Sequence, residues 1–163
     1  MERRGTLLLV EDEEILRGLV SQFLRNEGFE VAEAGDGGQG VERFHEQGPF
    51  DLLLVDLNLP VFSGVEVCRR VKLRCPSQKV MICSAAILRE HEEALLRLGV
   101  GHFLTKPYHP DQLLAHIRQE IQAEPVATPG LASRLASGSS DGQPRETGAS
   151  SPIAGHSLLH PLR

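Results

Sequence analysis

Short apolar runs alternate five times with longer stretches of helical periodicity between residues 6 and 122. This alternation is typical of β/α units, in which parallel strands are connected by helices. Right-handed crossovers between such strands give an open parallel sheet with helices on both faces. We therefore expect a three-layer α/β domain with strands at residues 6–10, 29–34, 51–55, 80–83 and 101–104, and helices at residues 13–27, 37–47, 64–74, 87–98 and 110–121.

The composition of each strand and helix predicts how it is placed. Residues 7–10 and 52–55 are continuous apolar runs, as expected of central strands, whereas residues 29–34 roughly alternate and favour an edge strand. Gly28 is expected to end the first helix in a left-handed conformation. The apolar residues of that helix are predicted to share one buried face: Ile15, Leu16, Leu19, Val20, Phe23 and Leu24.

Charge and hydropathy argue against several classes of protein. The chain has 17 basic and 22 acidic residues and a formal net charge of −5, so it lacks the basic character of a nucleic-acid-binding domain. No apolar run approaches the roughly 18 residues of a membrane span, and the N-terminal run is too short for a signal peptide. Cys68, Cys75 and Cys83 form no CxxC pair, which favours a reduced, cytoplasmic protein.

The composition changes after residue 122. Residues 123–163 contain no aromatic residue but five Pro, five Gly and seven Ser. Such a segment buries too little apolar surface to fold by itself. We therefore expect a folded domain at residues 1–122, followed by a disordered tail at residues 123–163.

Polar side chains follow four of the five predicted strands. Glu11 and Asp12 follow the first strand, Asp56 the third and Ser84 the fourth, and Lys106 lies just beyond the fifth. The carboxyl ends of parallel strands share one edge of the sheet, where ligands bind in folds of this type. Three carboxylates at one edge repel one another, so they need a divalent cation, an ammonium group or both. Mg²⁺ prefers such oxygen ligands together with phosphate oxygens, which indicates phosphoryl-transfer chemistry.

The residues around these positions resemble a known family. The four motifs are Val10-Glu11-Asp12-Glu13, Asp56-Leu57-Asn58-Leu59-Pro60 with Gly64, Cys83-Ser84-Ala85, and Lys106-Pro107. In order and spacing, residues 6–122 resemble the receiver domain of two-component response regulators, which is related to the single-domain chemotaxis regulator. The resemblance implies a flavodoxin-like fold with strand order 2-1-3-4-5.

The resemblance also implies a role for each site residue. Asp56 is expected to be the phosphoacceptor, which attacks the phosphoryl group that a phosphohistidine presents. Ser84 is expected to hydrogen-bond a phosphoryl oxygen and Lys106 to pair with another, and the Lys106–Pro107 bond is commonly cis in this family. Such catalysis consists of positioning and charge neutralisation.

The expected cofactor is Mg²⁺. The resemblance implies that Asp12 and Asp56 bind the ion directly, Glu11 through water and Asn58 through its backbone carbonyl. No other cofactor is expected. The seven histidines show no ligand spacing, so we expect them to be solvated or structural: His45, His91, His102, His109, His116, His156 and His160.

A conformational switch is expected to carry the signal. In the family, the phosphoryl group draws the hydroxyl of the residue at Ser84 inward, and an aromatic residue, here Phe103, fills the vacated space. Phe103 stands where Tyr is commoner, so a switch step that needs a phenol hydroxyl is absent. The expected partners are a sensor histidine kinase or phosphotransfer protein and a downstream protein that reads the face formed by residues 87–121. Neither nucleic acid nor membrane is an expected partner.

The preferred interpretation is a single-domain response regulator that catalyses only its own phosphorylation and dephosphorylation, and is otherwise not an enzyme. Three alternatives stay open: a receiver-like scaffold that is not phosphorylated, a receiver fragment of a longer regulator, and a metal-dependent phosphatase of the haloacid dehalogenase type. The phosphatase predicts a DxD nucleophile on the first strand, where Glu11-Asp12 stands instead.

Overall fold

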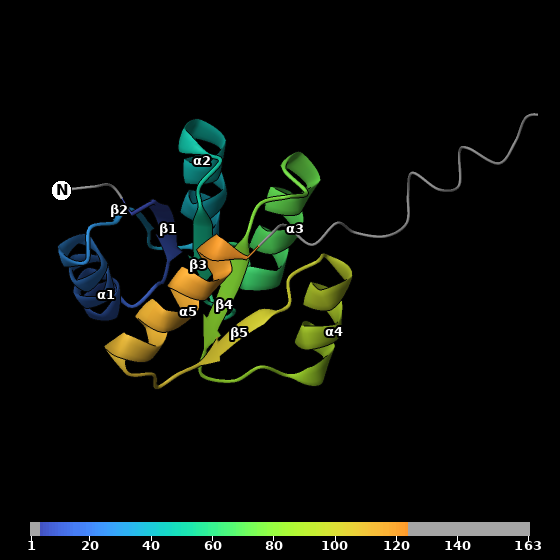
Figure 1. Cartoon of the computed structure of the whole chain (residues 1–163). Helices are drawn as coiled ribbons and strands as arrows, with labels where there is room; N and C mark the ends of the chain where they lie inside the picture. The colour runs from blue at the N-terminus through green and yellow to red at the C-terminus, as the bar shows by residue number, and fades with distance from the viewer. Residues whose placement is uncertain (1–3, 124–163) are drawn as a thin grey trace, which may run out of the picture. The chain divides into compact units, whose positions relative to one another are not determined.

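The computed structural model describes residues 4–123, in which five strands alternate with five helices (Figure 1). The strands are β1 (Thr6–Val10), β2 (Glu30–Ala34), β3 (Leu52–Val55), β4 (Val80–Ser84) and β5 (His102–Thr105). The helices are α1 (Glu14–Asn26), α2 (Gly37–Gln47), α3 (Gly64–Arg74), α4 (Arg89–Arg97) and α5 (Pro110–Gln122). All ten elements occur where the sequence predicts them, with boundaries that differ by at most two residues.

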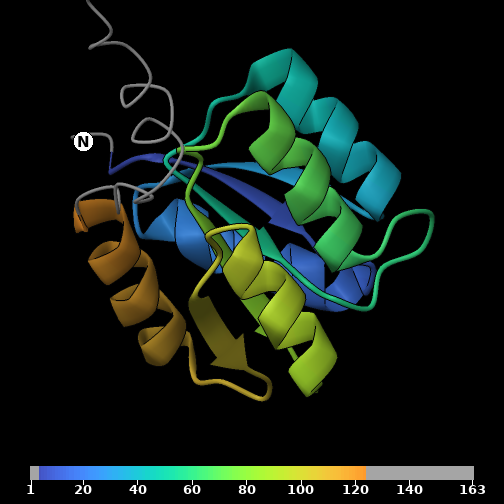
Figure 2. The same cartoon turned by 90° about the vertical axis from the view of Figure 1, so that its right-hand side faces the viewer.

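The five strands form one parallel sheet in the order β2-β1-β3-β4-β5. Helices α1 and α5 cover one face, and α2, α3 and α4 cover the other (Figures 1 and 2). The predicted three-layer fold and its strand order are thus confirmed, including the edge position of β2.

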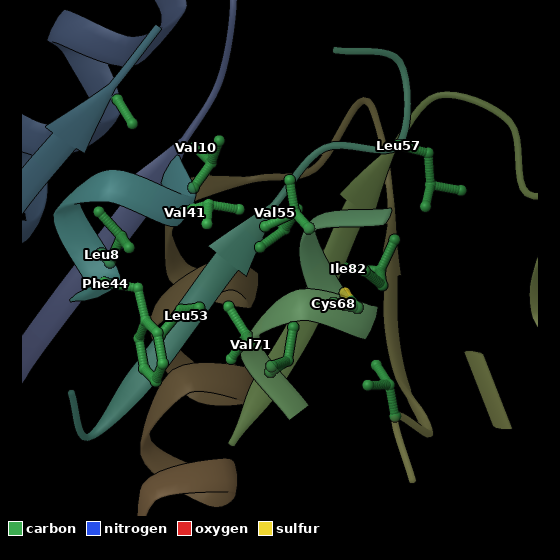
Figure 3. Close-up of a cluster of buried hydrophobic side chains, with 14 of the residues drawn as sticks. Leu8, Val10, Val41, Phe44, Leu53, Val55, Leu57, Cys68, Val71 and Ile82 are labelled. Atoms are coloured by element: carbon green, nitrogen blue, oxygen red, sulfur yellow. The ribbon is translucent and has the colours of Figure 1, made fainter. Parts of the chain in front are cut away.

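Two apolar cores form because successive side chains of a strand point to opposite faces of the sheet. On β3, Leu53 and Val55 point toward α2 and α3, while Leu52 and Leu54 point toward α1 and α5. Figure 3 shows the first of these cores, in which Phe44 of α2 packs beside Leu53. None of these strand side chains is more than 1% exposed, so β3 is rigidly held from both sides.

The end of α1 follows the sequence prediction. Gly28 has a φ of 93°, which disfavours any side chain, and its N–H donates to the Arg25 carbonyl at 3.0 Å. The Phe29 N–H donates to the Leu24 carbonyl at 3.1 Å, so the last carbonyls of the helix are satisfied.

One prediction for α1 is wrong. Val20 and Leu24 are buried, but Ile15 is 75% exposed and Leu19 is 67% exposed. At 100° per residue, Leu16, Val20 and Leu24 lie close together on one stripe, whereas Ile15 and Leu19 lie about 90° or more to its side. Leu16, Val20, Phe23 and Leu24 pack into the core on the α1–α5 face, so the apolar surface of α1 is wider than its buried face.

The predicted tail lies, from residue 124 onward, outside the described residues, so the domain boundary and the disorder of the tail stay predictions. Ala123 caps α5, where its N–H donates to the Gln119 carbonyl. No helix in the described part of the chain is long and apolar enough to cross a membrane.

Candidate functional site

The five predicted site residues meet at the carboxyl edge of the sheet. Parallel registers align Val10 with Val55 and Ser84 with Thr105, so the residues that follow these strands share one edge. Hydrogen bonds fix the two neighbouring loops: the Asp56 N–H donates to the Val10 carbonyl at 3.0 Å, and the Lys106 N–H donates to the Ser84 carbonyl at 2.9 Å.

Lys106 connects two of the three carboxylates. Its ammonium nitrogen lies 2.5 Å from Glu11 Oε2 and 2.5 Å from Asp56 Oδ2. Glu11 is 4% exposed and Asp56 is 7% exposed, so both carboxylates are taken from water. Burial disfavours the charged form of Lys106, but the hydrogen bonds to Asp56 and Glu11 outweigh it and raise the pKa of Lys106 above its usual 10.5.

The other oxygen of Asp56 accepts two further hydrogen bonds. The Ser84 hydroxyl donates to Asp56 Oδ1 at 3.0 Å, and the Asn58 N–H donates to the same oxygen at 3.0 Å. Ser84 is completely buried at the end of β4. Donors from three segments therefore fix the orientation of the Asp56 carboxylate.

The spacing between Asp56 and Gly64 has a steric cause. The loop returns so closely that the Gly64 N–H donates to the Leu57 carbonyl at 2.9 Å. A Cβ at residue 64 would lie 2.2 Å from the Asp56 carbonyl oxygen and 2.8 Å from Leu57 Cα. Both are backbone atoms, which cannot move away by changing rotamer as a side chain can. Glycine is therefore required where α3 starts beside Asp56.

The same loop contains a strained turn. Val61 has a φ of 69°, and the Phe62 N–H donates across it to the Pro60 carbonyl at 2.9 Å. A γ-turn with positive φ is rare and strained, and a β-branched side chain disfavours it further. Val61 is also 73% exposed, so little burial compensates this strain.

The acidic residues can hold a cation. Glu11, Asp12 and Asp56 each offer an oxygen, and these three atoms all lie within 4.8 Å of one another. Asp12 is exposed, so the group is open to solvent on one side. Three formal negative charges and the one positive charge of Lys106 leave a net −2, which a divalent cation neutralises. This hard, all-oxygen set fits Mg²⁺.

Phe103 lies on β5, two residues before Thr105, which pairs with Ser84. It pairs with Ile82 in the register of β5 and β4, and its half-buried ring packs against the core on the α2–α4 face. The Lys106–Pro107 bond is cis, as the resemblance implies.

Two residues near the site were not predicted from the sequence. Arg17 donates from Nη1 to the Glu11 carbonyl at 2.7 Å and so holds the backbone that carries Glu11 and Asp12. Its place at the end of the first turn of α1 gives only a weak signal, because arginine is common on helix surfaces. Tyr108 packs against the core on the α1–α5 face, where burial raises the pKa of its phenol.

The protein is thus a doubly wound α/β domain in which three carboxylates and Lys106 meet at the carboxyl ends of the strands. A family model described as "Response regulator receiver domain" matches residues 7–118. The chain therefore belongs to the receiver-domain family of two-component response regulators.

Curated relatives support this assignment. The chain is 38% identical over 117 residues to the sensory transduction protein RegX3 of Mycolicibacterium smegmatis, covering 72% of this chain and 50% of RegX3. It is 30% identical over 133 residues to the probable transcriptional regulatory protein TcrX of Mycobacterium tuberculosis, covering 82% of this chain and 56% of TcrX. The chain thus spans about half the length of these relatives.

Solved structures agree. A CheY-like response regulator receiver domain protein from Methanospirillum hungatei JF-1 is 28% identical with a TM-score of 0.68, covering 71% of this chain and 92% of the other. The receiver domain of sensor histidine kinase PA1611 from Pseudomonas aeruginosa PAO1 is 27% identical with a TM-score of 0.65, covering 73% of this chain and 98% of the other. That receiver domain is described with a magnesium ion coordinated in the active site cleft.

Proposed function

We propose that Asp56 accepts a phosphoryl group from the phosphohistidine of a sensor histidine kinase or phosphotransfer protein. The observation that carries the proposal is the Asp56 carboxylate, oriented by Ser84, Asn58 and Lys106 beside two further carboxylates. Family membership and the motif order support the same assignment.

The reaction is a transfer of one phosphoryl group. A carboxylate oxygen of Asp56 forms a bond to phosphorus while the bond from phosphorus to the histidine nitrogen breaks. The histidine keeps the electron pair of that bond and then takes up a proton. We expect Lys106 and the Ser84 hydroxyl to stabilise the oxygens of the transferring group, because both contact the Asp56 carboxylate.

The proposed cofactor is Mg²⁺, which supplies positive charge to the phosphoryl oxygens when it is bound. Asp12, Asp56 and the Asn58 carbonyl are the proposed direct ligands, and Glu11 acts through water. The magnesium described in the PA1611 receiver domain supports this choice of ion. The chain is proposed to catalyse only its own phosphorylation and dephosphorylation.

The proposed output is a change at the face of α4, β5 and α5. A phosphoryl group on Asp56 attracts the buried Ser84 hydroxyl, which now points to Asp56 Oδ1. Phe103, which lies half-buried on the neighbouring strand, then occupies a different position. A downstream protein that binds one arrangement more tightly shifts the balance between the two.

Intact-mass analysis tests the phosphorylation step. The full chain is incubated with acetyl phosphate, with and without Mg²⁺, beside Asp56→Asn and a control, Asp111→Asn, whose side chain is 85% exposed. We expect one Mg²⁺-dependent phosphoryl adduct on the wild type and the control, and none on Asp56→Asn. Equal labelling of Asp56→Asn would reject the assignment.

A further inference from the structure

Two histidines that lie far apart in the sequence meet between β5 and α5. His102 begins β5, and His116 lies in the middle of α5. His102 Nε2 is 3.0 Å from His116 Nδ1, and the rings are nearly perpendicular at 83°. The other nitrogen of His102, Nδ1, is 2.6 Å from Glu120 Oε2. The three side chains form a continuous row from a carboxylate through two imidazoles.

Glu120 determines which nitrogen of His102 is available as a ligand. A carboxylate accepts a hydrogen bond, so the proton of the neutral His102 ring lies on Nδ1 and the lone pair lies on Nε2. That lone pair faces His116 Nδ1, which therefore carries the proton between the two rings in the metal-free protein. For His116 Nδ1 to bind a metal ion, the neutral His116 ring must carry its proton on Nε2 instead. Histidines that bind metal ions show the same arrangement, in which a carboxylate holds the far nitrogen and raises the basicity of the near one.

We propose that His102 Nε2 and His116 Nδ1 form a binding site for a divalent transition metal ion such as Zn²⁺, with Glu120 as a positioning residue. Two nitrogens bound tetrahedrally at ~2.0–2.1 Å from zinc lie about 3.3 Å apart. The observed separation of 3.0 Å is close to this value, and the two rings must rotate so that both lone pairs point to one ion. The side chains of His102 and Glu120 are each 21% exposed, so water reaches the remaining coordination positions.

This site differs in chemistry from the acidic pocket. Imidazole nitrogens select zinc, copper and nickel, whereas carboxylate and carbonyl oxygens suit magnesium. Within residues 4–123, three side chains that could bind a metal ion come together in the acidic pocket. The histidine site has two protein ligands and is completed by water. A metal ion there ties the edge strand β5 to α5 and stabilises the fold according to its concentration.

The test is calorimetric titration of the full, untagged chain with Zn²⁺ in a large excess of Mg²⁺, which occupies the carboxylates. We expect one binding event that weakens at least about tenfold in His102→Gln and in His116→Gln. Glu120→Gln should weaken it on the order of tenfold, the usual effect of an outer-shell partner. His45→Gln is the matched control, because His45 is exposed on α2, and its affinity should equal that of the wild type.

Imidazole NMR signals give a second readout on the unaltered chain. We expect the His102 and His116 rings to change together at one equivalent of Zn²⁺, before any other histidine. Circular dichroism checks that each variant is folded, and the wild-type NMR titration decides the matter if one is not. Unchanged affinity in both histidine variants, or changes confined to other histidines such as His156 and His160, would overturn the proposal.

Discussion

Two groups of polar side chains lie at different edges of the same sheet, and they are held together in different ways. At the carboxyl edge, Lys106 bridges Glu11 and Asp56, whose carboxylates are almost fully buried. At the β5–α5 edge, His102 joins His116 and Glu120, which remain partly exposed to water. Buried carboxylates require a cation, because their hydration is lost. Partly exposed imidazoles stay hydrated and do not require a cation.

Backbone strain follows the same division. Among the described residues, Val61 is the non-glycine residue with positive φ, and it lies in the loop that leads from Asp56 to α3. Neither β5 nor α5 contains such a residue. Charge crowding and strain are therefore concentrated at the carboxyl edge, where the proposed phosphoryl transfer needs fixed groups. The β5–α5 edge carries neither.

The largest expected effect is that of Lys106→Met. Removing the ammonium leaves two buried carboxylates without a compensating positive charge. We expect the free energy of unfolding to fall by about 2 kcal/mol. This is less than the ~3–5 kcal/mol lost when a fully enclosed ion pair is broken, because the pocket is open to water at Asp12. Urea denaturation measures this loss. Lys79→Met is the control, because within residues 4–123 the Lys79 ammonium donates to the carbonyls of Ile121 and Ala123, and it should lose about 1 kcal/mol. Added Mg²⁺ should restore part of the lost stability in Lys106→Met but not in Lys79→Met. Equal losses in the two variants, with no effect of Mg²⁺ on either, would contradict the special role of Lys106.

Alkaline pH should weaken the ion pairs of Lys106 at the carboxyl edge. The pKa of Lys106 lies above its usual 10.5 in the folded protein. A group whose pKa is higher in the folded than in the unfolded protein stabilises the fold fully at pH values below its unfolded pKa. This stabilisation is lost as the pH rises through its pKa in the folded protein. Unfolding free energy should therefore fall above a pH of about 10.5, and Lys106→Met should fall less steeply. Superimposable slopes for the two proteins in alkaline urea titrations would refute this expectation.

Val61→Gly should stabilise the protein by about 1 kcal/mol. A non-glycine residue in this conformation costs roughly 1–3 kcal/mol, while the added backbone freedom of glycine costs roughly 0.5–1 kcal/mol. The exposed valine loses little burial on removal. Thermal denaturation measures the gain, with Val65→Gly inside α3 as a control that should be destabilised. A loss of stability in Val61→Gly would show that the turn is not strained.

The smallest effect should come from His102→Gln without added metal. Its hydrogen bonds to His116 and Glu120 are partly exposed, so we expect a loss of about 0.5 kcal/mol, at the lower end for such contacts. Chemical denaturation with a chelator present measures it. A loss as large as that of Lys106→Met would erase the distinction between the two edges.

The sequence predicts the carboxyl edge well because strand periodicity fixes the position of each site residue. Glu11, Asp56, Ser84 and Lys106 all follow short apolar runs, and parallel strands bring such positions together whatever their separation in the chain. The structure adds what periodicity cannot supply, namely that Lys106 contacts both carboxylates and that Ser84 already donates to Asp56.

The contact between His102 and His116 at the β5–α5 edge could not be predicted from the sequence, for a physical reason. His102 and His116 belong to different elements, so no fixed spacing relates them, and their contact depends on how α5 is rotated against the sheet. The exposure of Ile15 and Leu19 has a similar origin. Hydrophobicity defines the apolar surface of α1, but the width of the sheet contact decides how much of it is buried.

Locating the phosphoryl group in the labelled chain tests whether Asp56 is the residue that carries it. Borohydride reduces an aspartyl phosphate to homoserine, which tandem mass spectrometry places in the sequence. After Mg²⁺-dependent labelling with acetyl phosphate, we expect homoserine at position 56 and at no other aspartate. Homoserine at Asp12 or another aspartate, with residue 56 unchanged, would contradict it.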